Sequence, residues 1–217
     1  MRRKAGRPLP TRVPTQYHSA HRRRGRRIGL LGGSFNPAHD GHRHISLVAL
    51  ARLELDEVWW LVSPQNPLKP ADGMAPFEAR FAGAREMARH PKIIVSDIER
   101  RFGTRRSAQT IARLRAAQPH DRFVWLMGAD LLPEMGDWYD WPAIFNAVPV
   151  AVFDRWPYAR LAQASKAAQR FGRTRCPERL AATLASQTPP AWIFFHSPLH
   201  PASATDLRRV RSAGETE

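Results

Sequence analysis

The 217-residue sequence contains a single cysteine, Cys176, and no long hydrophobic run. One cysteine excludes an intramolecular disulfide framework and is typical of a reducing compartment. No stretch approaches the roughly 18 consecutive apolar residues that a membrane-spanning helix needs. The sequence therefore predicts a cytoplasmic protein without a membrane partner, in which Cys176 packs rather than reacts.

Acidic residues are missing from the first 27 positions, which hold nine arginines and Lys4. The formal net charge of the chain is +15, and +10 of it lies in this segment. Because prolines interrupt the segment and no apolar periodicity appears, we expect residues 1–26 to be a basic disordered tail, followed by a single domain at 27–217. A tail that binds RNA or directs targeting stays an alternative. The rest of the chain is only mildly basic, as expected for an enzyme with anionic substrates.

Short apolar runs alternate with longer stretches of helical pattern from residue 27 onward. The runs are rich in β-branched and aromatic residues, which is typical of strands buried on both faces. They are Arg27–Leu31, Glu57–Val62, Lys92–Val95, Arg122–Met127, Val148–Phe153 and Ala191–Phe195. Helices are expected at Gly41–Leu55, Pro76–Arg89, Ser107–Gln118, Trp138–Phe145 and Tyr158–Leu184, the last broken near Gly172 to Pro177. The alternation predicts an α/β protein with a mostly parallel sheet and helices on both faces.

The stretch GGSFNPAHDGH, residues Gly32 to His42, directly follows the first predicted strand. Parallel α/β sheets bind ligands at the carboxyl ends of their strands. The adjacent glycines let the backbone approach a ligand, and the helix that starts near Gly41 would offer free N–H groups to a phosphate. His39 and His42 could donate hydrogen bonds to the same anion. No further Cys or His has a usable ligand spacing, which argues against a metal site; a structural loop with incidental histidines remains the alternative.

This stretch resembles the signature of nucleotidyltransferases with a His-x-Gly-His motif, and most closely that of nicotinate mononucleotide adenylyltransferases. The matching residues are Gly32, Gly33, Ser34, Phe35, Asn36, Pro37, His39, Gly41 and His42. The resemblance covers about residues 27–212 and implies the Rossmann-like nucleotidyltransferase fold. It implies that the adenylyl group of ATP passes to nicotinate mononucleotide in NAD biosynthesis, with Mg²⁺ bridged by phosphates and without protein ligands to the metal.

The ATP site implied by the resemblance combines both ends of the domain. The stretch ASATDLR, Ala202 to Arg208, resembles a second family motif, in which Ala204 replaces a serine. Ser203 and Thr205 would open a helix, and Arg208 would hold the β- and γ-phosphates. The resemblance makes His39, His42 and Arg208 catalytic. It assigns ATP binding to Gly32, Gly33, Ser34, Phe35, His39, Gly41, His42, Ser203, Thr205 and Arg208.

The mononucleotide site is implied by three other stretches that resemble family segments. In FVWLMGADLLPEMGDWYDW, from Phe123 to Trp141, Trp138 would lie against the nicotinate ring. In GTRRSAQTI, from Gly103 to Ile111, a helix N-terminus would bind the nicotinate carboxylate, with Ser107 as its N-cap and Arg106 where tyrosine is common. VSPQNPLKP contributes a loop lysine. The residues expected at the mononucleotide are Asn36, Lys69, Ser107, Asp130, Trp138 and Tyr139.

Other functions stay open at this point. The acceptor could be nicotinamide mononucleotide or phosphopantetheine instead of nicotinate mononucleotide. A protein that binds nucleic acid through the tail would lose most of its affinity on deletion of the tail and with rising salt concentration. A catalytically inactive scaffold is disfavoured by the intact His39, His42 and Arg208.

Overall fold

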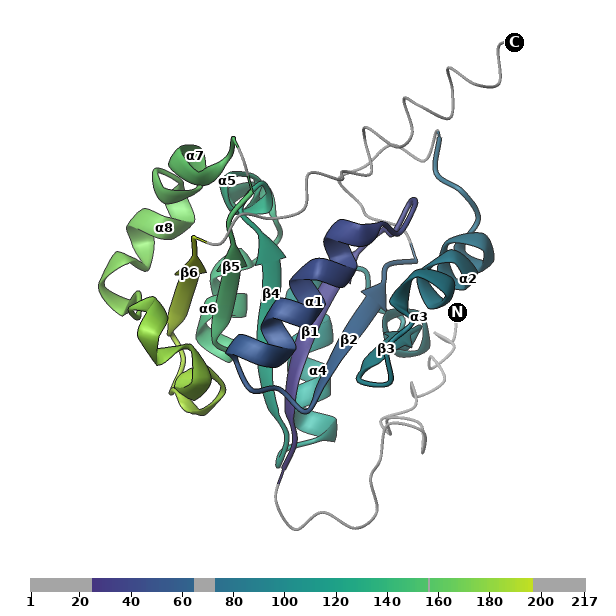
Figure 1. The fold of residues 1–217 in the computed structure, drawn as a ribbon, viewed down its shortest axis with the longest axis horizontal. Coiled ribbons are helices and arrows are strands. Elements are labelled where there is room, and N and C mark those ends of the chain that lie inside the picture. The colour runs from purple at the N-terminus through teal and green to yellow at the C-terminus, as the bar shows by residue number, and fades with distance from the viewer. Residues whose placement is uncertain (1–24, 65–72, 156, 197–217) are drawn as a thin grey trace, which may run out of the picture.

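Six parallel strands form one sheet, seen in Figure 1. The computed structural model describes residues 25–64, 73–155 and 157–196. The strands are β1 (Arg27–Gly33), β2 (Glu57–Val62), β3 (Ile93–Ser96), β4 (Arg122–Gly128), β5 (Val150–Phe153) and β6 (Trp192–Phe195). Their order in the sheet is β3-β2-β1-β4-β5-β6, and every neighbouring pair is parallel. The predicted Rossmann-like α/β fold is confirmed.

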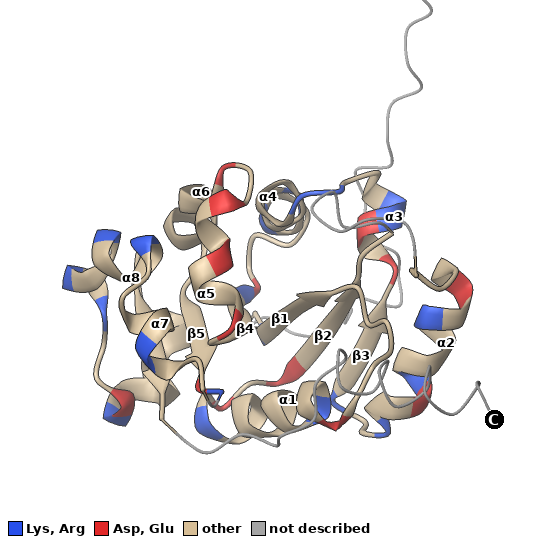
Figure 2. Cartoon of the chain, turned by 90° about the horizontal axis from the view of Figure 1, so that it is seen from above, with Lys and Arg blue, Asp and Glu red and all other residues tan. Residues whose placement is uncertain are grey.

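Helices cover both faces of this sheet, as the view onto the carboxyl ends of the strands shows (Figure 2). One face is covered by α1 (Asp40–Arg52), α2 (Phe77–Ala88) and the 3₁₀ helix η4 (Glu178–Ser186). The other face is covered by α3 (Ile98–Phe102), α4 (Ser107–Ala117), α5 (Leu131–Glu134), α6 (Trp141–Ala147), α7 (Ala159–Gln163) and α8 (Lys166–Arg170). The 3₁₀ helices η2 (Met135–Asp137) and η3 (Gly172–Thr174) complete the described part of the chain, in which no helix is long and apolar enough to cross a membrane.

The strands are apolar along nearly their whole length because both of their faces are covered. In β2, Trp59 and Leu61 point into the core beneath α3 and α4, whereas Val58, Trp60 and Val62 point into the core beneath α1 and α2. All five side chains are completely buried. Period-two alternation thus distributes one apolar run between two cores.

The observed strands lie within two residues of the predicted ranges. The longest extension is at β1, which continues through Gly32 and Gly33, paired with Leu61 and Val62 of β2. Gly32 is required by packing, since a Cβ there would lie 2.6 Å from the indole Cη2 of Trp125 on β4. The two glycines are therefore the last residues of the strand and not part of the loop that follows it.

Two of the predicted helices are wrong. The helix expected at Trp138–Phe145 begins only at Trp141, because Asp140 has a φ of 49° and turns the chain. The helix expected at Tyr158–Leu184 is interrupted near Gly172 to Pro177, as predicted, but its first half is divided into α7 and α8 and its second half is the 3₁₀ helix η4. One cause lies at Ser165, whose hydroxyl accepts a hydrogen bond from Ala168 N–H and so caps a new helix.

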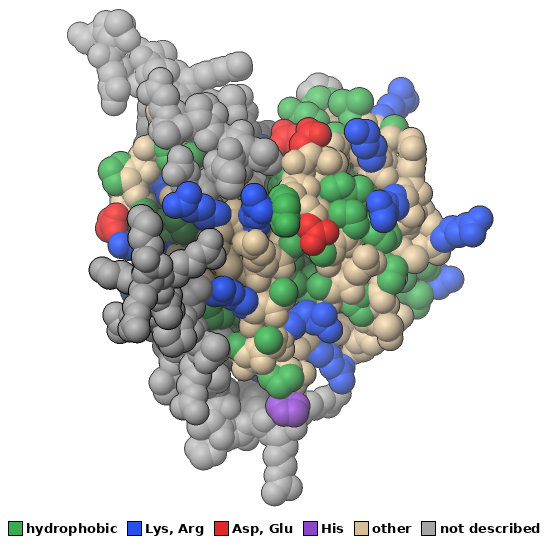
Figure 3. Space-filling model, turned by 180° about the vertical axis from the view of Figure 1, so that it is seen from behind, with side chains coloured by type: hydrophobic (Ala, Val, Ile, Leu, Met, Phe, Trp, Pro, Cys, Tyr) green, Lys and Arg blue, Asp and Glu red, His purple; other side chains and the backbone are tan. Residues whose placement is uncertain are grey.

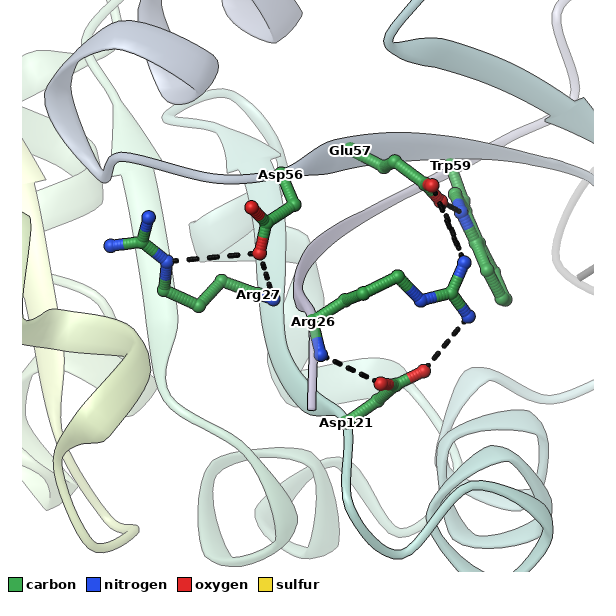
Figure 4. Close-up of polar contacts among 6 residues, drawn as sticks. All are labelled: Arg26, Arg27, Asp56, Glu57, Trp59 and Asp121. Atoms are coloured by element: carbon green, nitrogen blue, oxygen red, sulfur yellow. Dashed lines mark hydrogen bonds and ion pairs between the residues drawn. The ribbon is translucent and has the colours of Figure 1, made fainter. Parts of the chain in front are cut away.

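Arg26, which the sequence assigned to the basic tail, is buried where the strands begin (Figure 4). Its backbone N–H donates to Asp121 Oδ1 at 2.8 Å, and its guanidinium reaches Asp121 Oδ2 at 2.9 Å and Glu57 Oε2 at 3.2 Å. The guanidinium also lies over the Trp59 indole, which donates its own N–H to Glu57 at 2.8 Å. Arg26 therefore belongs to the folded domain, one residue before its predicted start.

Candidate active site

The candidate site lies at the carboxyl ends of β1 and β4, which are neighbours in the centre of the sheet. From β1 the chain passes to β2 on one side, and from β4 it passes to β5 on the other. The connections after β1 and β4 therefore diverge at a topological switch point, which is the position where α/β sheets bind ligands. The segment between β1 and α1 holds the predicted phosphate motif.

His39 and His42 cap the start of α1 reciprocally. His39 is the N-cap residue, and its Nδ1 accepts a hydrogen bond from the backbone N–H of Gly41 at 3.1 Å. The Nδ1 of His42 accepts one from the backbone N–H of His39 at 3.2 Å, and the two ring centroids are 3.9 Å apart. Because Nδ1 is the acceptor in both rings, each neutral imidazole has its proton on Nε2. Two N–H donors of fixed tautomer thus lie together at the positive end of a helix.

The His42 ring is held from the side by aromatic packing. Phe35, which has a φ of 48° and is completely buried, lies with its ring centroid 4.7 Å from that of His42. Phe35 in turn stacks on Trp60 of β2 at 5.1 Å. The Trp60 indole donates to Ser46 Oγ at 2.7 Å, and that hydroxyl donates to the His42 carbonyl at 2.8 Å. The strained backbone at Phe35 is thereby maintained by the packing that orients His42.

Arg80 of α2 fixes the loop that carries the motif. Its side chain is almost fully buried, and burial lowers the pKa of its guanidinium below the ordinary range. The guanidinium donates to four backbone carbonyls, those of Ser34 at 2.5 Å, Ser63 at 2.9 Å, Pro64 at 3.0 Å and Ala75 at 2.9 Å. One side chain therefore connects the loop after β1 to the chain after β2 and to the approach to α2.

Asn36 is engaged with the same approach to α2. Its side-chain amide donates to the Gly73 carbonyl at 3.0 Å and accepts from Ala75 N–H at 3.3 Å. Asn36 was predicted as a mononucleotide contact, and the structure shows a side chain that ties two loops together. Through these hydrogen bonds, Asn36 helps to position the phosphate motif.

The other half of the candidate site comes from the segments that follow β4 and β5. Asp130 lies just after β4, and its Oδ2 accepts a hydrogen bond from Arg155 Nη1 at 2.7 Å. A Cβ at Gly128 would lie 2.4 Å from Asp130 Oδ1, so a glycine is required for this carboxylate to occupy its position. Trp138 packs partly buried against the core, and Tyr139 beside it is 59% exposed.

The remaining predicted residues divide into two groups. Ser107 is the first residue of α4 and not its N-cap; the N-cap is Arg106, which makes no side-chain cap hydrogen bond. The prediction of a Ser107 cap is thus wrong by one residue, as helix ends often are. The residues outside the described ranges are Lys69, Ser203, Thr205 and Arg208. Within the described ranges, no cluster of three or more His, Cys, Asp or Glu side chains could hold a metal ion.

The sequence analysis missed Arg80, Trp60 and Arg155. A signal for Arg80 was available, because it occupies the same buried stripe of α2 as Ala84 and Ala88, four and eight residues further on. An arginine in an apolar stripe indicates a buried guanidinium with acceptors. Neither Trp60 nor Arg155 has such a signal, since their partners come from other elements.

A parallel sheet of this order, with a glycine-rich loop and a histidine-capped helix at its centre, is typical of α/β nucleotidyltransferases. The profile of the cytidylyltransferase-like family matches residues 30–210. The chain belongs to this family, and within it to the nicotinate-nucleotide adenylyltransferases, as two relatives show. It is 51% identical over 83% of its length to a "Probable nicotinate-nucleotide adenylyltransferase" of Cereibacter sphaeroides, of which it covers 96%. It is 49% identical over 87% of its length to a protein of the same name from a Caulobacter species, covered in full.

A solved structure supports the same fold at much lower sequence identity. It is the Plasmodium falciparum nicotinic acid mononucleotide adenylyltransferase complexed with NaAD, with a TM-score of 0.62 and 14% identity. The similarity covers 85% of this chain and 83% of that one. The fold is therefore shared across distant sequences.

Proposed function

We propose that this protein transfers the adenylyl group of ATP to nicotinate mononucleotide, forming nicotinate adenine dinucleotide and pyrophosphate in the biosynthesis of NAD. The observation that carries the proposal is the reciprocally capped pair His39 and His42 at the start of α1. Membership of the adenylyltransferase family supplies the reaction class, and the names of the relatives supply the acceptor.

The reaction is an in-line displacement at the α-phosphorus of ATP. A phosphate oxygen of the mononucleotide forms a bond to this phosphorus, and the bond to the oxygen that bridges the α- and β-phosphates breaks. The nucleophile is already an anion, so no general base is required. Catalysis then depends on positioning and on stabilising the charge that grows on the α-phosphate and on pyrophosphate.

The Nε2–H groups of His39 and His42 suit this task, because they are neutral donors of fixed direction at a helix N-terminus. We assign the α-phosphate contact to His42 and a neighbouring phosphate contact to His39. The backbone of Gly32 to Phe35 and Gly41 lines the ATP site. The resemblance of ASATDLR to the second family motif supports Ser203, Thr205 and Arg208 as contacts of the β- and γ-phosphates.

Mg²⁺ enters this reaction as part of the substrate, the magnesium complex of ATP. Magnesium keeps several water ligands and binds phosphate oxygens readily, so it needs few protein ligands. The donor set of the described residues fits this assignment, since histidine N–H donors approach phosphates and do not bind a cation.

The acceptor site is assigned to the wall formed after β4 and at the start of α4. Trp138 offers an aromatic face for the pyridine ring, and we assign the contact to the ribose to Asp130, which lies just after β4. Asn36, Lys69, Ser107 and Tyr139 complete the proposed set. We also propose that the protein acts in the cytoplasm.

The test is pyrophosphate release from ATP and Mg²⁺ with nicotinate mononucleotide and nicotinamide mononucleotide offered separately. Strong preference for the acid supports the proposal. Preference for the amide would keep the mechanism but change the acceptor. Release with neither nucleotide, but with phosphopantetheine, would contradict the proposed acceptor, and release with none of the three would contradict the activity.

A further inference from the structure

We propose that Arg106 is a specificity-determining residue whose guanidinium pairs with the carboxylate of the nicotinate ring. The inference rests on the proposed function, because it concerns the acceptor of that reaction. It explains how this chain would distinguish an acid from its amide.

The topology places Arg106 at the correct edge of the sheet. Helix α4 begins after β3 and α3 and leads to β4, so in a parallel sheet its first residue lies at the carboxyl end of the strands. Figure 2, which views this edge, shows basic residues along the connection between α3 and α4. Trp138 and Tyr139 follow β4 and reach the same edge.

The Arg106 side chain points toward the proposed pyridine site. Its guanidinium carbon lies 3.7 Å from the centroid of the Tyr139 ring, directly beside Trp138 in sequence. Both Arg106 and Tyr139 are exposed, so the stacked pair faces solvent and can meet a ligand. Stacking on an aromatic face leaves the edge of a guanidinium open to hydrogen-bond acceptors.

The described part of the chain gives Arg106 no carboxylate partner. Two arginines near this edge already have partners. Arg80 donates to backbone carbonyls, and Arg155 is paired with Asp130 at 2.7 Å. Arg106 is thus the arginine of the three whose charge is not already balanced or spent on backbone acceptors.

The base of the Arg106 side chain is fixed by a buried polar cluster. Thr104 and Thr110 share a hydrogen bond of 2.7 Å, and Thr110 donates to Glu99 Oε1 at 3.3 Å. Thr110 N–H also donates to the Arg106 carbonyl at 3.1 Å, which closes the first turn of α4. The arginine therefore extends from a hydrogen-bonded junction at the start of α4.

A guanidinium matches a carboxylate in charge and geometry, because it can donate two parallel N–H groups to the two oxygens. A carboxamide has no negative charge and places an N–H₂ donor where the second oxygen would be. Arg106 accordingly favours nicotinate over nicotinamide in the bound mononucleotide. Arg106 therefore contributes to the binding of the mononucleotide and not to the chemistry at the α-phosphorus.

The experiment measures steady-state kinetics of Arg106→Ala and Arg106→Lys with both mononucleotides. Arg105→Ala is the matched control, because it removes the same charge from the adjacent exposed position. We expect Arg106→Ala to raise KM for nicotinate mononucleotide about tenfold, without a similar change for the amide or for ATP. Arg106→Lys keeps the charge but not the fork and should lie between Arg106→Ala and the wild type.

The inference is overturned if Arg106→Ala and Arg105→Ala behave alike, or if acid and amide are affected equally. A wild-type protein that turns over neither mononucleotide would instead contradict the proposed function, and the inference would fall with it. An active wild type with an unchanged Arg106→Ala variant would contradict the inference alone.

Discussion

Two histidines meet two requirements of the molecule at once. A helix that starts at Asp40 leaves backbone N–H groups without helical acceptors, and the Nδ1 atoms of His39 and His42 satisfy two N–H groups at this start. The reaction needs donors for phosphate oxygens, and the same hydrogen bonds fix the remaining ring proton on Nε2. The cap that stabilises α1 therefore also orients the catalytic donors.

Replacing His42 should separate these two requirements. In His42→Asn, the side-chain oxygen can accept from His39 N–H, but the ring N–H is lost. We expect kcat to fall by about 10²–10³, the usual effect of losing one transition-state donor, with little change in Tm. The measurement is pyrophosphate release together with a thermal melt. His90→Asn, which alters a histidine in the turn before β3, serves as the control; turnover of His42→Asn equal to that of the control would remove His42 from the mechanism.

Arg80 lies close to the candidate site, and its role there is structural. Arg80→Met would leave four partly buried carbonyls without their donor, and we expect a loss of about 3 kcal/mol in the free energy of unfolding. Arg80→Lys should lose less, because an ammonium reaches some of the same acceptors. Urea unfolding checks this, with Arg85→Met, an exposed arginine of the same helix, as the control. Equal stability of the two methionine variants would contradict the assignment.

At the scale of elements, α3 and α4 are joined around a buried carboxyl. Glu99 is 5% exposed, and its burial raises its pKa to about 7 from an ordinary value of 4.5. Hydrogen bonds from Thr110 and Ser63 oppose this shift but do not cancel it. No cation is among the causes of the shift, so the carboxyl remains protonated in the folded protein under mildly acidic conditions.

This predicts a dependence of stability on pH. Between the two pKa values the folded chain retains the Glu99 proton that the unfolded chain has lost, so stability falls as pH rises from 4.5 to about 7 and is level above it. Glu99→Gln removes this contribution. Relative to Glu99→Gln, the wild type should lose about 2.5 kcal/mol between about pH 5 and about pH 8.

Urea unfolding of both proteins across this range is the measurement, and Glu86→Gln, an exposed carboxylate of α2, is the control. The difference between wild type and Glu99→Gln must change with pH, whereas the difference for Glu86→Gln should stay constant. A constant difference for both variants would show that Glu99 is ionised in the folded state.

The sequence predicted some elements well for physical reasons. The central strands are continuous apolar runs buried on both faces, and α1, α2 and α4 lie between them with clear limits. Within the region from Tyr158 to Leu184, the break near Gly172 to Pro177 was predicted, but the division of α7 from α8 was not. The alanine-rich composition favours one helix there, whereas the hydroxyl of Ser165 caps a new one. Tertiary packing decided this division, and composition does not record it.

The site was predictable where its residues are close in sequence. The motif from Gly32 to His42 gave both histidines and their place at a helix start. Arg80 lies 46 residues from Ser34, and Arg155 lies 25 residues from Asp130. These pairs depend on which strands are neighbours, which spacing in the sequence does not reveal. The sequence likewise does not reveal the stacking of Arg106 on Tyr139, because the two residues come from different elements.

On one face of the described part of the chain, basic side chains are spread and not gathered, although +10 of the net charge of +15 lies in residues 1–27. Figure 3 shows basic side chains distributed over the face covered by α4 and α6, with acidic side chains at only a few positions. A spread charge raises the local concentration of anionic substrates without defining a second binding surface. Two clusters of polar contacts in the described part of the chain lie at opposite ends of the strands. The histidines lie at the carboxyl ends, and Arg26 and its partners lie at the amino ends.

These two edges should respond independently to mutation. Arg26→Met would leave Asp121 and Glu57 without their shared cation at a largely buried edge, and we expect the free energy of unfolding to fall by about 3 kcal/mol. Because Arg26 lies at the opposite edge from His39, KM for both substrates should stay unchanged. Urea unfolding and steady-state kinetics on the same preparations test both statements.

The control for Arg26 is a chain that lacks residues 1–24, which loses eight basic residues but keeps Arg26 and its contacts. We expect it to match the full chain in unfolding free energy, because Arg26 anchors the start of β1 through Asp121 without help from net charge. If the truncated chain lost as much stability as Arg26→Met, the tail would be part of the folded domain. If neither variant lost stability, the Arg26 pairs would be worth no more than exposed ion pairs, which contribute little.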